Sequence, residues 1–121
     1  MNALVCADRV LAPVSAEDEA SLHGIVELRQ TIARLSERLG VPAPGLVALL
    51  TRWQRHRISS REMEDALIAE ALAPIGRIPS RSALMSRAAV RRVPVTLSAP
   101  DSSPAVAYAS LADVLTEVIA R

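Results

Sequence analysis

The chain has 121 residues, half of them hydrophobic and 22% charged, which suits one domain. All 14 basic residues are arginine, so no lysine exists to form a Schiff base or to complete a G-x-x-x-x-G-K-S/T phosphate loop. The one cysteine and two histidines lack ligand spacing, and no nucleophile, base and oxyanion donor can be grouped. We therefore expect no enzyme activity, no metal and no cofactor.

The sequence also lacks a membrane signal. The longest apolar run covers residues 46–50, far short of the roughly 18 residues that a membrane span requires. No basic stretch precedes the first apolar residues, so we expect no signal peptide. Because a single cysteine fits a reducing compartment, the expected location is the cytoplasm.

The first predicted elements are a short segment and a long helix. Residues 2–14 alternate weakly and are interrupted by Pro13, as in an arm or a short edge strand. Ser15 with Asp18 resembles a capping box, and Gly40 followed by Pro42 ends the helix.

Apolar residues recur in this helix at spacings of three and four. Isoleucine alternating with leucine in such a heptad seam favours two-stranded coiled coils. The same stripe also suits a helix packed on its own domain's core, and both interpretations remain open. The predicted dimer interface consists of Ile25, Leu28, Ile32, Leu35 and Leu39.

Three further helices are predicted in the middle of the chain, over residues 44–57, 60–73 and 80–92. The first places Leu46, Leu49 and Trp53 on one face, and a capping box of Ser59 and Glu62 precedes the second. The third begins after Pro79 and ends before Pro94.

The pattern changes after residue 92, where two short alternating runs flank a turn-rich segment. This predicts a β-hairpin over residues 93–109. A competing prediction is one long helix that begins at Pro104 and is capped by Ser103. The hairpin is favoured because Ser110 and Asp113 offer a fresh cap for a last helix over residues 111–120.

Positive charge is concentrated in residues 51–92, which hold nine arginines and four acidic residues, a net charge of +5. Arginine presents a planar fork that suits phosphate oxygens and guanine edges, and a basic helix can enter the major groove of DNA. Gripping an acidic protein partner and forming a solvated face are the alternatives for this segment.

The order helix, helix, basic helix, hairpin, helix resembles a winged helix-turn-helix. Residues 58–67 are similar to the segment that opens this motif in MarR-like transcription regulators, residues 80–87 resemble a recognition helix, and residues 101–111 resemble a wing. The resemblance implies a dimeric regulator whose basic helix reads duplex DNA. The expected DNA contacts are Arg81, Ser82, Ser86, Arg87 and Arg91, with flanking phosphate contacts from Arg52, Arg55, Arg57 and Arg61.

The expected fold is therefore mainly α with one β-hairpin. Residues 1–41 would form an N-terminal arm and dimerisation helix, and residues 42–121 a winged-helix-like domain. The alternative function is a non-enzymatic helical adaptor, chaperone or secretion-associated regulator that binds a protein partner.

Overall fold

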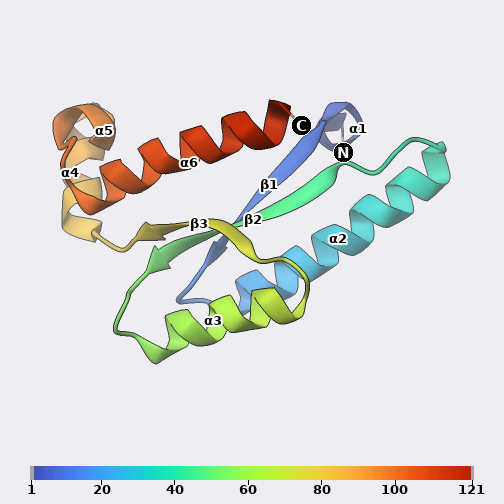
Figure 1. The fold of residues 1–121 in the computed structure, drawn as a ribbon, viewed down its shortest axis with the longest axis horizontal. Helices are drawn as coiled ribbons and strands as arrows, with labels where there is room; N and C mark the ends of the chain where they lie inside the picture. The colour runs from blue at the N-terminus through green and yellow to red at the C-terminus, as the bar shows by residue number, and fades with distance from the viewer. Residues whose placement is uncertain (1, 121) are drawn as a thin grey trace.

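The computed structural model describes residues 2–120, without the side chains of residues 2, 82 and 120. Its centre is a three-stranded parallel sheet in the order β1-β2-β3, with helices on both faces (Figure 1). The elements in chain order are α1 Asn2–Cys6, β1 Arg9–Ser15, α2 Glu19–Leu39, β2 Gly45–Trp53, α3 Ile58–Ala69, β3 Pro74–Pro79, α4 Ser82–Arg91, α5 Val95–Ser98 and α6 Ser103–Ala120.

The expected mainly helical fold with one β-hairpin is wrong. The segment predicted as a helix over residues 44–57 contains the central strand β2, and residues 74–79 form the third strand. Successive residues of β2 are buried on opposite faces, with Leu49 in one core and Leu50 in the other. A strand covered on both faces has a continuous apolar sequence, which periodicity alone does not separate from a helix.

The predicted hairpin over residues 93–109 is replaced by the short helix α5 and the first turns of α6. The Ser102 hydroxyl accepts a hydrogen bond from the Ala105 N–H at 3.4 Å, and Pro104 is fully buried in the first turn of α6. The competing prediction of one long helix is therefore the observed one, with the cap one residue earlier than Ser103.

The two α-helical layers bury separate cores. Helices α2 and α3 lie on one face of the sheet, where Val14, Leu50 and Leu67 are completely buried (Figure 1). Helix α6 lies on the other face, where Leu111 packs with Leu49 and Ile78. This layering follows from the topology, because two consecutive crossovers of the same hand place their helices on the same side of a parallel sheet.

The long helix ends as predicted but begins later. Asp18, not Ser15, is its N-cap and accepts a hydrogen bond from the Ala20 N–H at 2.9 Å. Gly40 closes the helix with a φ of 62°, the left-handed conformation that glycine adopts readily. The boundary expected after residue 41 falls between β1 and β2. Strand β1 pairs with β2 along its whole length, from Arg9 opposite Gly45 to Ser15 opposite Thr51.

Strand β1 forms one edge of the sheet. The Ala16 N–H donates to the Thr51 carbonyl at 2.9 Å, so the nitrogens of alternate residues from Ala16 backwards face β2. Pro13 has the opposite parity, and its nitrogen faces away from the sheet. Proline is tolerated at this position because no ladder bond is lost there.

Candidate anion-binding site at the carboxyl ends of the strands

All three strands end at the same edge of the sheet, and a cavity of about 570 Å³ opens there. In open α/β sheets, ligands bind in the crevice outside the carboxyl ends of the strands. Residues after β1, at the ends of β2 and β3, and from α4 and α6 line this cavity. They are Glu17, Thr51, Arg52, Gln54, Ile78, Pro79, Ser80, Arg81, Met85, Ser86 and Tyr108.

Arg52 occupies an unusual backbone conformation at this edge. The pairing of β2 with β3 changes register between Leu50 and Trp53, and Arg52 between them has a φ of 52°. A left-handed conformation costs a residue other than glycine about 1–3 kcal/mol, and such residues cluster at functional sites. An irregularity of this kind bends the strand and re-aims a side chain, here a guanidinium group at the cavity.

The charge of the cavity is predominantly positive. Glu17 lies 3.9 Å from Arg52, measured from Oε2 to Nη1, and its other oxygen lies 3.5 Å from Nη1 of Arg57. Within residues 2–120, no carboxylate lies at ion-pair distance from Arg81. This edge therefore carries three guanidinium groups and one carboxylate, which leaves capacity for a bound anion.

The cavity also has an apolar lining. Ile78 is buried, and Pro79, Met85 and Tyr108 are half-buried at its wall. The Ser80 N–H donates to the Trp53 carbonyl at 3.0 Å, which fixes the ends of β2 and β3 to one another. The arrangement can therefore hold a molecule that combines an anionic group with a flat or apolar ring.

The residues expected from the sequence to contact DNA lie at several separate places in the structure. Arg52, Arg81 and Ser86 line the cavity, and Arg81 also borders a hollow of about 380 Å³ together with Arg87. The other expected contacts are exposed: Arg55 and Arg57 in the loop after β2, Arg61 on α3 and Arg91 at the end of α4. The side chain of Ser82 lies outside the described part of the chain.

The heptad seam of α2 faces the chain's own sheet. Ile25 and Ile32 are 3% and 5% exposed within the core, and Leu28 packs against it. Leu35 is half-buried, and Leu39 is 51% exposed. Packing inside the domain therefore explains the two isoleucines of the seam without a second chain.

The prediction from sequence missed several residues of the cavity. Thr51 and Gln54 follow the apolar run of β2, and Tyr108 lies on the helix that was expected to be a hairpin. Polar residues directly after a buried apolar run are the signal that would have located this edge, provided that the run was interpreted as a strand.

Neither a metal centre nor a membrane span occurs in the described part of the chain. Across residues 2–120, no three histidine, cysteine or acidic side chains are grouped closely enough to hold a metal ion. The helices of the same residues are also too short or too polar to cross a lipid bilayer.

The class of the chain is defined by its fold alone, an α/β domain with a three-stranded parallel sheet. No family model matches the sequence. Two proteins of Mycobacterium tuberculosis, "Uncharacterized protein MT1749" of strain CDC 1551 / Oshkosh and "Uncharacterized protein Rv1708" of strain H37Rv, are each 29% identical to it over 119 residues. The alignment covers 97% of this chain and 37% of each relative, so the chain spans little more than a third of the relatives' length.

Proposed function

We propose that this chain binds a phosphorylated small molecule that carries a flat ring, the chemistry of a nucleotide, in the cavity at the carboxyl ends of the strands. The observation that supports this most directly is the left-handed backbone of Arg52, which directs a guanidinium group to the cavity that Arg81 also lines. Guanidinium forks bind phosphate oxygens in a bidentate manner, and the apolar wall with Tyr108 suits a ring.

The volume of the cavity agrees with such a ligand. Small-molecule sites commonly measure about 300–1,000 Å³ and combine an apolar lining with a few polar groups. The cavity of about 570 Å³ falls inside this range and has hydroxyl groups from Ser80 and Ser86 beside the two arginines.

The proposal is tested by calorimetric titration of the chain with ATP, AMP and inorganic pyrophosphate. The informative variant is Arg52→Gly, because glycine adopts a φ near 52° without strain while the guanidinium group is removed. We expect ligand affinity to fall about tenfold or more, as for the loss of one charged hydrogen-bonding group, with no loss of stability.

Arg92→Gly is the matched control. Arg92 also has a positive φ, of 56°, but it ends α4 and does not line the cavity. Ligand affinity should therefore be unchanged in this variant. Equal affinities of the original chain, the Arg52→Gly variant and the Arg92→Gly variant, or no binding of any of the three compounds, would overturn the proposal.

Duplex DNA is the second candidate ligand, as expected from the sequence. It is favoured by the exposed arginines that continue from the cavity onto the neighbouring surface, namely Arg55 and Arg57 on one side and Arg87 on the other. Phosphate contacts of this kind give an affinity that falls steeply with salt. A homodimer would double the number of contacts.

A band-shift titration at about 50 and 200 mM salt tests this candidate. The double variant Arg55→Ala/Arg91→Ala should weaken DNA binding and leave binding of a small phosphorylated ligand unchanged, because neither side chain lines the cavity or pairs with Glu17. DNA binding that is absent at low salt, or that does not change with salt, would exclude it.

A further inference from the structure

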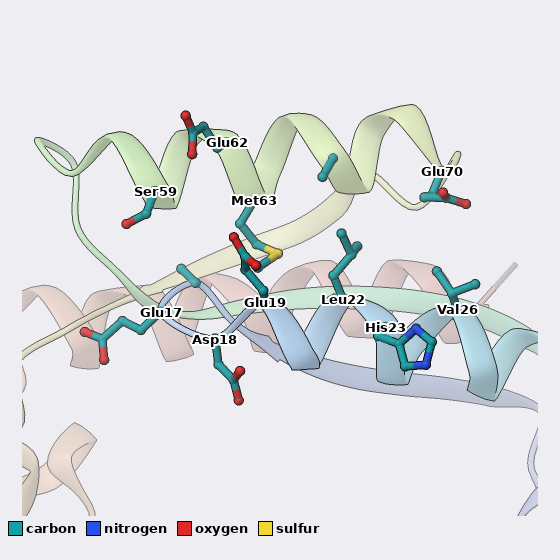
Figure 2. Close-up of a pocket in the computed structure, with 12 residues that line it drawn as sticks. Glu17, Asp18, Glu19, Leu22, His23, Val26, Ser59, Glu62, Met63 and Glu70 are labelled. Carbon is teal, nitrogen blue, oxygen red and sulfur yellow. The ribbon is translucent and has the colours of Figure 1, made fainter.

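A second cavity, of about 810 Å³, lies between α2 and α3 on the other side of Glu17 from the proposed ligand site. Figure 2 shows the two helices side by side, with Leu22 of α2 and Met63 of α3 directed into the space between them. Val26 and Ala66 extend the same apolar floor, and both are only half-buried. The floor continues into the main core, because Met63 belongs to that core and Leu22 and Val26 pack against it.

The border of this cavity is acidic. Glu19 begins α2 and extends toward α3, and Glu62 also lines the cavity, from the side of α3 that is farther from α2 (Figure 2). Within residues 2–120, no arginine lies at ion-pair distance from either carboxylate. Glu70 at the far end is paired with Arg29 at 2.7 Å.

Basic side chains are scarce in the cavity itself. His23 is the one basic side chain among the residues that line the cavity. Its Nε2 atom lies 3.1 Å from Oε1 of Glu27, which is one turn later on α2. Glu17 and Asp18 complete the acidic border, although Glu17 is shared with Arg57 and Asp18 caps α2. The field in the cavity therefore has the opposite sign to that of the ligand site.

We propose that this cavity is a docking groove for a basic amphipathic helix of a protein partner. An apolar stripe on that helix would pack on Leu22, Met63 and Ala66, and arginine or lysine residues flanking the stripe would pair with Glu19 and Glu62. The negative charge of the border favours a basic partner. An acidic helix would be repelled by these carboxylates, and a neutral helix would leave them without ion-pair partners. The inference is independent of the proposed ligand.

The test uses a labelled synthetic peptide of about 18 residues, with leucine at positions i, i+3, i+4 and i+7 and arginine on both sides of the stripe. A second peptide keeps the leucines and replaces each arginine with glutamate. Fluorescence anisotropy with the full chain should show saturable binding of the arginine peptide alone. Equal binding of the two peptides, or binding of neither, would overturn the proposal.

Two charge variants locate the binding. Glu19→Gln/Glu62→Gln removes two border carboxylates that have no ion-pair partner and should weaken peptide binding about tenfold. Glu37→Gln/Asp65→Asn removes two exposed carboxylates of the same helices outside the cavity and should change the affinity less than about twofold. Identical affinities for the two variants would show that the peptide binds elsewhere.

A third variant separates apolar docking from general charge attraction. Ala66→Glu places another acid on the floor, so apolar docking predicts weaker binding, whereas attraction by charge alone predicts tighter binding. Ala69→Glu adds the same charge at an exposed position of α3 outside the cavity. Tighter binding by the Ala66→Glu variant would overturn the docking mode.

A second copy of this chain is the competing occupant, because its arginine-rich helix α4 is also basic. Sedimentation of the chain without peptide distinguishes the two. We expect no self-association that responds to Glu19→Gln/Glu62→Gln. Oligomers that this double variant dissociates would show that the groove binds another copy and would overturn the assignment to a different protein.

Discussion

Glu17 and Arg52 face each other at 3.9 Å on the border between the two cavities, and Glu17 also pairs with Arg57. The carboxylate is 31% exposed, so the surrounding solvent weakens both pairs. Its position gives it two opposing effects: it holds two guanidinium groups in place and it competes with any anion for them.

The first prediction concerns this competition. Glu17→Gln keeps the shape of the side chain and removes its charge, so Arg52 is left without a carboxylate at ion-pair distance. We expect pyrophosphate and nucleotides to bind up to about tenfold more tightly by calorimetry, because a like charge near the site is lost. Glu37→Gln on the exposed surface of α2 is the control, and weaker binding by the Glu17→Gln variant would contradict the expectation.

The second prediction concerns the turn that carries the exposed arginines. Ser60 is completely buried, and its hydroxyl accepts a hydrogen bond from the Gln54 N–H at 3.1 Å. Ser60→Ala leaves this donor without its partner, and we expect a loss of about 1–3 kcal/mol in the free energy of unfolding by urea. Ser59→Ala, at an exposed position one residue earlier, should cost less than about 0.5 kcal/mol.

The third prediction compares the two glycines of the α2 region. Gly24 lies inside the helix with no heavy atom within 4 Å of an added Cβ, so Gly24→Ala should stabilise the fold by about 0.5–1 kcal/mol. Gly40 has a φ of 62°, so Gly40→Ala should destabilise it by about 1–2 kcal/mol. Thermal unfolding followed by circular dichroism measures both, and shifts of the same sign would contradict the assigned helix end.

The fourth prediction concerns adjacent residues of α3 with opposite exposures. Leu67 is completely buried in the main core, whereas Ile68 is 54% exposed. Leu67→Ala should lower the free energy of unfolding by about 2–5 kcal/mol through lost burial and the cavity that remains. Ile68→Ala should cost less than about 1 kcal/mol, and equal losses in urea titrations would mean that α3 is rotated from its position here.

The sequence predicted α2 and α3, which have a solvent-facing side, and missed the central strand β2, which is covered on both faces. In α2, charged residues alternate with a single apolar stripe, and Gly40 marks the end, so the helix could be located. In β2, Leu49 and Leu50 are buried on opposite faces, and the missing polar side removed the alternation that identifies a strand. Strand β3 is only six residues long with proline at both ends, which resembles a loop.

The candidate site could be predicted only in part for the same reason. Arg52, Arg81 and Ser86 were selected for their charge or hydroxyl group, and they line one cavity. Their convergence depends on two parallel strands ending at the same edge, which no local pattern encodes. The acidic groove was not anticipated, because Glu19 and Glu62 are more than 40 residues apart and each resembles an ordinary acidic residue at a helix start.

The outward-facing nitrogen of Pro13 hinders the exposed edge of β1 from pairing with a strand of a second molecule. A strand of another molecule that aligned with the outer edge of β1 would lack one backbone N–H donor, at Pro13. This gap interrupts the continuous backbone hydrogen bonding that fibrils need. Pro13→Val would restore this backbone N–H donor, two residues after the exposed Leu11. Concentrated solutions of the Pro13→Val variant should increase the fluorescence of amyloid-specific dyes, whereas solutions of the original chain should leave the dye fluorescence unchanged.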